Sequence, residues 1–93
     1  MKKASWKGKV IAESDKTVEV EGDFYFPPTS IHQEYFEKSD ETSMSPSKGK
    51  ASYYNIVVDG EKNEAAAWYY AHPKSEAKDI KNYVAFKKGV EIE

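Results

Sequence analysis

The chain has 93 residues, of which 39% are apolar and 14% aromatic, and it carries a formal net charge of −2 and no cysteine. A chain this short buries little more than about 60% of its unfolded surface, so we expect one domain spanning residues 1–93. The lack of cysteine excludes disulfides, thiolate metal sites and thiol catalysis, and it favours a reducing, cytoplasmic location. No apolar run approaches the ~20 residues of a membrane span, and the small negative charge predicts neither nucleic-acid nor membrane partners.

The first third of the chain is predicted to form short strands separated by polar turns. Between Thr17 and Glu21 apolar and polar residues alternate, which predicts a strand that turns Val18 and Val20 inward. Pro27 ends the aromatic run Phe24-Tyr25-Phe26, because proline has no N–H group to donate to a β-ladder. The predicted elements are a strand over 6–14, a hairpin turn over 14–17, a strand over 17–21, an aromatic strand over 24–26 and one helical turn over 29–32.

The middle of the chain changes composition sharply. Residues 33–38 are a possible strand, and residues 39–49 consist almost entirely of polar residues, proline and glycine, which predicts a long loop. Residues 50–58 form the strongest predicted strand, with Tyr53 on one face and Tyr54 on the other. A loop thus passes directly into the best strand of the sequence.

The last third begins with a strong turn signal at Asp59-Gly60, which predicts a two-residue hairpin. The returning strand over 65–70 contains three alanines that would equally suit a helix, but the hairpin turn and the Trp-Tyr-Tyr run favour a strand. Residues 75–81 are the one predicted helix, with Ser75 as its N-cap. Two short closing strands are predicted over 83–86 and 90–92.

These elements together indicate the fold class. Many short strands, closely spaced turns and one short helix predict a mainly β protein, a compact antiparallel barrel-like or sandwich domain with one short α-helix near the C-terminus. The order of the strands does not follow from the sequence.

The candidate site lies where the predicted loop enters the strongest strand. Lys48 supplies positive charge and Gly49 lets the backbone approach a ligand, which together can form an anion-binding corner or a plain turn. The rings of Tyr53, Tyr54 and Trp68 can floor a pocket that stacks a planar ligand, or they can serve as core. The further aromatic candidate is Tyr25.

Other polar residues suggest weaker sites. Glu19 and Glu21 could share a divalent cation, although alternating carboxylates are usually the solvated face of a strand. His32 and His72 are the only histidines, and nothing in the sequence brings them together. We therefore predict no metal site and no cofactor, and we keep His32 as a candidate for a lone general base.

Several segments spread over nearly the whole chain carry a family resemblance. They are Ile11-Ala12-Glu13-Ser14, Glu21-Gly22, Tyr25-Phe26-Pro27, Pro46-x-Lys48-Gly49-x-Ala51-x-Tyr53, Ala66-Ala67-Trp68-Tyr69-Tyr70, Pro73, Ile80 and Tyr83-Val84-Ala85-Phe86. Together they resemble the family called domain of unknown function 427, which also carries the label nucleotidyltransferase-like. The resemblance implies a compact, mainly antiparallel β domain with a short helix before its last strands, and no established activity.

Three positions depart from the usual pattern of that family. Ser45 stands where cysteine is expected, Ser47 where an aromatic residue is expected, and Ala71 where proline is common. A family role that needed the thiol would be lost here, whereas one resting on Lys48 and Tyr53 is unaffected. Nucleotidyl transfer, the reaction that the label implies, would require several carboxylates around magnesium. The sequence offers only one close acidic pair, Glu19 and Glu21.

The sequence predicts a small cytoplasmic binding module for an anionic or planar small molecule at the Lys48-Gly49 loop. Two alternatives stay open: an enzyme acting on a nucleotide or small metabolite, and a structural or protein-interaction domain. In the enzyme, Lys48 would stabilise charge while Tyr53 or His32 transfers protons. The oligomeric state does not follow from the sequence.

Overall fold

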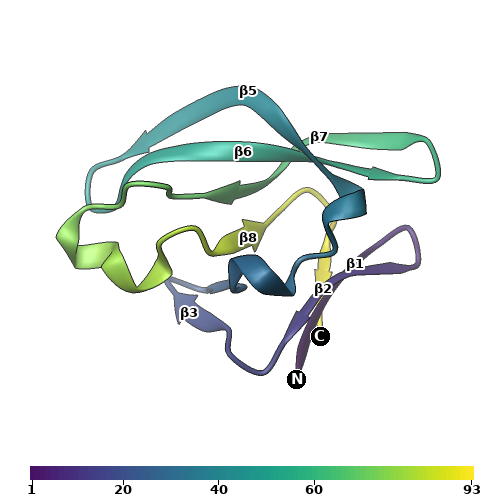
Figure 1. The fold of residues 1–93 in the computed structure, drawn as a ribbon, viewed down its shortest axis with the longest axis horizontal. Coiled ribbons are helices and arrows are strands. Elements are labelled where there is room, and N and C mark those ends of the chain that lie inside the picture. The colour runs from purple at the N-terminus through teal and green to yellow at the C-terminus, as the bar shows by residue number, and fades with distance from the viewer.

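The computed structural model describes residues 1–93, most of which lie in antiparallel strands. Three sheets form, with strand orders β2-β1-β9, β3-β4 and β5-β6-β7-β8 (Figure 1). The predicted mainly β class is confirmed, and no sheet closes into a barrel. The elements are β1 Lys2–Trp6, β2 Lys9–Ser14, β3 Val18–Val20, β4 Asp23–Tyr25, η1 Pro28–Ser30, η2 Gln33–Tyr35, β5 Phe36–Ser45, β6 Gly49–Val58, β7 Glu61–Tyr69, η3 Ser75–Ile80, β8 Val84–Phe86 and β9 Glu91–Ile92, where η marks a 3₁₀ segment.

The four-stranded sheet carries apolar side chains on both of its faces. Successive residues of a strand point to opposite faces. On β6, Ala51 and Tyr53 contact one cluster of buried residues, whereas Tyr54 and Ile56 contact a second one. Parts of both faces of the sheet are therefore covered, which is closer to a sandwich than to a barrel.

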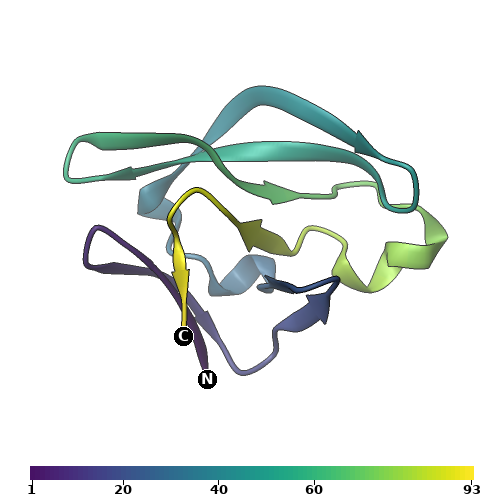
Figure 2. The same cartoon turned by 180° about the vertical axis from the view of Figure 1, so that it is seen from behind.

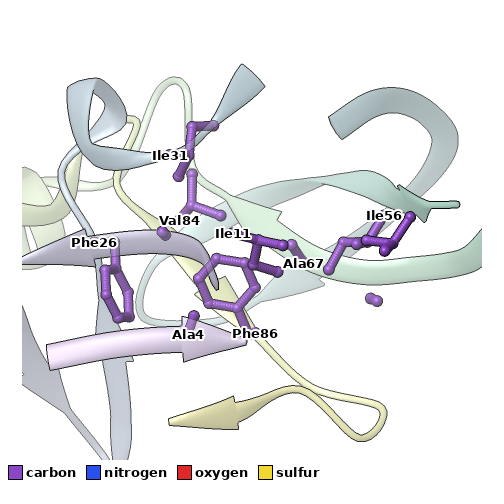
Figure 3. Close-up of a cluster of buried hydrophobic side chains, with 11 residues drawn as sticks. Ala4, Ile11, Phe26, Ile31, Ile56, Ala67, Val84 and Phe86 are labelled. Carbon is purple, nitrogen blue, oxygen red and sulfur yellow. The ribbon is translucent and has the colours of Figure 1, made fainter. Parts of the chain in front are cut away.

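The larger cluster, called here the large core, packs the four-stranded sheet against β1, β2 and the segment that follows β4. It contains only alanine, valine, isoleucine and phenylalanine, and the rings of Phe26 and Phe86 meet edge to face with centroids 5.5 Å apart (Figure 3). Apolar burial of this kind supplies most of the favourable free energy of folding. Its members are Ala4, Ile11, Ala12, Phe26, Ile31, Ile56, Val58, Ala66, Ala67, Val84 and Phe86.

The smaller cluster, called here the tyrosine core, covers the opposite face beneath the β3–β4 hairpin and η3. Val18 and Val20 pack against it, which confirms the inward face that their alternation predicted. The Trp68 indole N–H donates to the Tyr25 hydroxyl at 3.3 Å, and the two rings meet edge to face. Its members are Tyr25, Ala51, Tyr70, Ala77, Ile80 and Ala85.

Dipeptides that end in glycine form several of the tight turns. Asp59-Gly60 joins β6 to β7 as predicted, with φ angles of 51° and 81°. Positive φ at both positions is the geometry of a type I′ turn, whose twist matches that of the flanking strands. Glu21-Gly22 joins β3 to β4 in the same way, with φ angles of 54° and 87°.

Two predictions made from local sequence are wrong. The predicted strand over 6–14 is part of a hairpin, because β1 ends at Trp6 and β2 begins at Lys9. The predicted loop over 39–49 is largely strand, because β5 continues to Ser45 and pairs with β6. An outer strand with both faces near water needs no apolar side chains, so its polar composition resembled that of a loop.

The predicted α-helix over 75–81 is also different. The structure has a 3₁₀ segment at Ser75–Ile80, interrupted by the non-helical backbone of Ala77. Lys74 occupies the N-cap position, and no side chain caps the segment. Six residues are too few for a stable α-helix, whereas 3₁₀ geometry is common in short pieces. Ala77 is nevertheless buried, so the apolar spacing had indicated the inward face of the segment.

Elements that are distant in the sequence meet at one end of the molecule. Figures 1 and 2 show the β5–β6 turn, η3 and β3 gathered there, while the paired strands β1 and β9 near the two termini lie away from it. None of the helical segments has the length and apolar character needed to cross a membrane. The end formed by these three elements contains the candidate site.

Candidate functional site

A pocket of about 240 Å³ lies between the β3–β4 hairpin, η3 and the β5–β6 turn. Its lining combines an apolar wall with charged residues from three separate segments. A second pocket, of about 330 Å³, lies beside the β1–β2 turn and contains none of the predicted site residues. The first pocket is lined by Val18, Val20, Glu21, Ser47, Lys48, Glu76, Ala77, Asp79 and Ile80.

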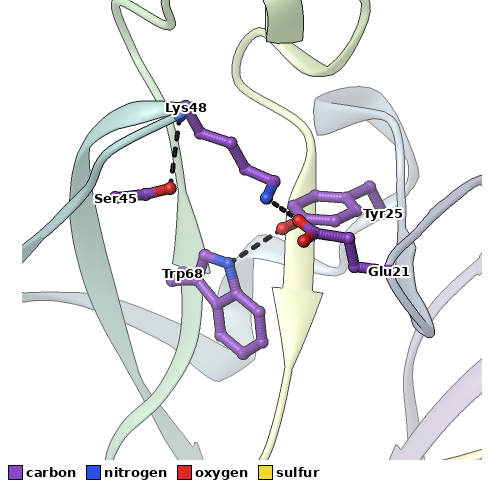
Figure 4. A network of polar contacts seen from close by, with 5 residues as sticks. All are labelled: Glu21, Tyr25, Ser45, Lys48 and Trp68. Carbon is purple, nitrogen blue, oxygen red and sulfur yellow. Dashed lines mark hydrogen bonds and ion pairs between the residues drawn. The ribbon is translucent and has the colours of Figure 1, made fainter.

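Lys48 is the one basic residue of this lining. Its side chain is only 12% exposed, and its ammonium group pairs with the carboxylate of Glu21, whose side chain is 70% exposed (Figure 4). A lysine whose side chain is mostly covered is stabilised by an anionic partner, because a charge removed from water without a partner is unfavourable. The contact with Glu21 raises the pKa of Lys48 above its usual value, so the group is positively charged at neutral pH.

The backbone beside Lys48 is held by contacts with the segment that precedes η3. The Lys74 N–H donates to the Lys48 carbonyl at 2.8 Å, and the Lys74 ammonium group donates to the Pro46 carbonyl at 2.6 Å. Within the turn, the Lys48 N–H donates to the Ser45 hydroxyl at 3.2 Å. These contacts fix the position from which the Lys48 side chain extends toward Glu21.

Gly49 has a structural part in this arrangement. Its φ of 107° lies in a region that only glycine occupies without strain. A Cβ at this position would lie 3.5 Å from the His72 carbonyl oxygen and 3.6 Å from the Lys74 nitrogen. Gly49 is buried and does not line the pocket, so it shapes the turn that presents Lys48.

The predicted aromatic residues are divided between the two faces of the four-stranded sheet. Tyr25 and Trp68 contact each other in the tyrosine core, and Tyr53 lies opposite Trp68 in the register of β6 and β7. Tyr54 lies on the other face, where it stacks on Tyr69 with ring centroids 4.7 Å apart. None of these rings lines the pocket.

His32 lies apart from Lys48. It precedes η2, and its Nε2 is 3.7 Å from a carboxylate oxygen of Glu13 on β2. It does not line the pocket, so the structure does not bring it together with the charged loop. No group of three or more His, Asp or Glu side chains could together hold a metal ion.

Burial sets the ionisation of the tyrosines near the site. It raises the pKa of Tyr25 to about 12, and it also raises the pKa of Tyr70, where the nearby Lys48 charge acts in the opposite direction. Burial likewise raises the pKa of Asp23, again against the effect of Lys48. The tyrosines are therefore neutral at physiological pH, and the lining of the pocket takes its charge from Lys48 and its carboxylates.

The sequence did not identify the apolar wall as part of a site, although its parts were visible. The alternation around Val18 and Val20 indicated one inward face, and the spacing of Ala77 and Ile80 indicated another. What the sequence could not indicate is that these two faces meet beside Lys48, because that depends on how the segments pack.

Comparison with known proteins identifies a family for this chain. No curated protein matches the sequence. A family model described as Domain of unknown function (DUF427) matches residues 2–93, and this confirms the resemblance that the sequence segments indicated. The chain therefore belongs to the family described as Domain of unknown function (DUF427).

Proposed function

We propose that this protein is a binding domain for a small molecule, and that an anionic group of the ligand contacts the Lys48 ammonium group. The observation that carries the proposal is a lysine only 12% exposed at the side of a pocket with an apolar wall. Ligand sites in proteins are typically concave and largely apolar, with a few placed polar groups that orient the ligand.

The size of the pocket limits the ligand. Pockets for drug-sized molecules measure roughly 300–1,000 Å³. The volume beside Lys48 is about 240 Å³, which suits a smaller organic molecule. The predicted stacking of a planar ligand has no support from the lining, because none of the candidate rings contributes to it.

Two further expectations differ in their support. The enzyme alternative would need Tyr53 or His32 beside Lys48, but neither residue lines the pocket, and His32 contacts Glu13 instead. The absence of cysteine supports a cytoplasmic location for the binding domain. A domain that has no disulfides does not need an oxidising compartment in order to fold.

Titration with small carboxylates tests the proposal. We expect the amide signals of Val18, Lys48 and Ala77 to shift in two-dimensional NMR spectra as hexanoate is added, because these residues line the pocket. Lys48→Met retains the length of the side chain and removes its charge. This variant should bind hexanoate at least tenfold more weakly than wild type.

Lys50→Met is the matched control, since Lys50 is an exposed lysine two residues away that does not line the pocket. This variant should bind hexanoate as the wild type does. Signals that do not move, or that move equally in Lys48→Met, would contradict the proposal.

A further inference from the structure

We infer that the ligand is a small apolar monocarboxylic acid, and that the Glu21 carboxylate holds the place of its acid group in the free protein. The inference rests on the proposed function and adds to it the chemical class of the ligand. Three features of the pocket lead to it: the contact between Lys48 and Glu21, the charge of the remaining lining, and the apolar wall.

The contact between Lys48 and Glu21 already places a carboxylate on the ammonium group. Both residues line the pocket, but Glu21 is 70% exposed whereas Lys48 is 12% exposed. The exposed Glu21 side chain can rotate away with little loss of packing, while the Lys48 ammonium group, at the end of a mostly covered side chain, is stabilised by keeping an anionic partner. The group that replaces Glu21 with the least change in charge and size is another carboxylate.

The charge of the lining limits how much negative charge the ligand can carry. Glu76 and Asp79 also line the pocket, and neither forms an ion pair. Once Glu21 has moved aside, the two carboxylates of Glu76 and Asp79 and one ammonium group remain around the ligand. Like charges at short distance repel, so a second negative charge on the ligand is unfavourable. Dicarboxylates, inorganic phosphate and nucleotides are therefore expected to bind more weakly than a monocarboxylate.

The apolar wall selects the rest of the ligand. Val18 and Val20 from β3 line the pocket together with Ala77 and Ile80 of η3, and the latter two are buried members of the tyrosine core. Each methylene group buried against such a wall raises affinity by about fourfold. We therefore expect hexanoate to bind more tightly than acetate.

The test compares simple probes and two variants of the full chain by NMR titration. We expect wild-type protein to bind hexanoate more tightly than adipate, inorganic phosphate, adenosine monophosphate or hexylamine. Glu21→Gln should bind hexanoate about fivefold more tightly than wild type, because the ligand no longer competes with an internal carboxylate. Glu19→Gln is the matched control: Glu19 lies on β3 two residues before Glu21, is exposed and does not line the pocket, so its loss should leave the affinity unchanged.

Each contrary outcome overturns a defined part of the inference. If wild type and Glu21→Gln bind hexanoate with equal affinity, and circular dichroism shows that both proteins are folded, the role of Glu21 is overturned. Tighter binding of adipate, phosphate or adenosine monophosphate overturns the monocarboxylate class while the proposed anion site at Lys48 stands. Tighter binding of hexylamine overturns the class and shows that the carboxylates govern recognition. If no anion moves the signals around Lys48 in either protein, the proposed function itself fails.

Discussion

The large core and the tyrosine core cover opposite faces of one sheet but differ in chemistry. The large core has 11 buried residues, all without polar side-chain atoms, whereas the tyrosine core has six, of which two are tyrosines. An apolar cluster gains stability from packing alone, but buried hydroxyl groups must also keep hydrogen-bond partners. The difference indicates that the large core mainly stabilises the fold, while the tyrosine core also supports a polar surface.

The position of the pocket agrees with this division. Ala77 and Ile80 belong both to the tyrosine core and to the lining of the pocket, and no member of the large core lines it. A ligand in the pocket would therefore contact the smaller and more polar cluster. Variants on the two faces should differ accordingly, and they can be ranked by expected effect.

The largest effect is expected from Phe26→Ala in the large core. Phe26 is fully buried, and truncation of such a ring removes apolar contacts and leaves a cavity. We expect the free energy of unfolding to fall by about 3–5 kcal/mol, measured by urea denaturation. Met44→Ala is the control, because Met44 is 71% exposed and its loss should change little. Similar losses in the two variants would contradict the assignment of the large core as the stabilising face.

The second effect is a dependence of stability on high pH that arises in the tyrosine core. Burial raises the pKa of Tyr25 from an ordinary value of 10.0 to about 12, so the unfolded chain releases this proton first. The stabilisation is fully present below pH 10.0 and is lost as the pH rises toward about 12. The shift corresponds to about 3 kcal/mol.

Urea denaturation between neutral and strongly alkaline pH measures this dependence. Wild-type protein should lose more stability than Tyr25→Phe over the alkaline range, because the phenylalanine has no proton to release. At neutral pH the variant should be about 1 kcal/mol less stable, since the Trp68 indole loses its acceptor. Parallel pH profiles for the two proteins would contradict the prediction.

A smaller effect is expected from Gly49→Ala at the turn that presents Lys48. The φ of 107° disfavours any residue with a Cβ, so we expect a loss of about 2 kcal/mol in the free energy of unfolding. Gly8→Ala is the control, because Gly8 has a φ of 77° and open space around the added Cβ. It should lose about 1 kcal/mol and leave the Lys48 amide signal in place. Equal losses, or a Lys48 signal undisturbed in Gly49→Ala, would contradict the structural part assigned to Gly49.

The smallest effect lies outside both cores, at an exposed ion pair between β5 and β7. The Glu37 carboxylate accepts hydrogen bonds from the Lys62 ammonium group at 2.7 Å and from the Asn55 side-chain amide at 3.1 Å. These two contacts hold the pKa of the Glu37 carboxyl below its usual value. Lys62→Met should move the carboxyl titration of Glu37, followed by carbon NMR, back toward higher pH. A lowered pKa of Glu37 adds stability in full only at pH values above the ordinary pKa of a glutamate carboxyl. Because the pair is exposed, the free energy of unfolding should barely change in Lys62→Met. An unchanged titration in Lys62→Met, or a change equally large in Lys50→Met, would contradict this.

Local patterns in the sequence predicted the elements whose cause is local. The strand over 50–58 follows from alternation and the hairpin at Asp59-Gly60 from turn chemistry, and both are confirmed. The part of β5 beyond Lys38 was predicted as a loop, because an exposed outer strand carries little apolar signal. The alternation also separated Tyr53 from Tyr54, although both were proposed for one pocket floor. The candidate ligand-binding residues themselves stay a prediction.

The sequence by itself determined a mainly β domain, the inward faces of β3 and η3, and Lys48 as the charged residue of interest. These follow from side-chain alternation, turn residues and composition, which act over a few residues. Only the tertiary structure decided that Lys48 meets Glu21, 27 positions earlier in the chain, and that two apolar faces converge beside it. Such contacts depend on the order and curvature of the sheets, because packing brings together segments that no local pattern relates.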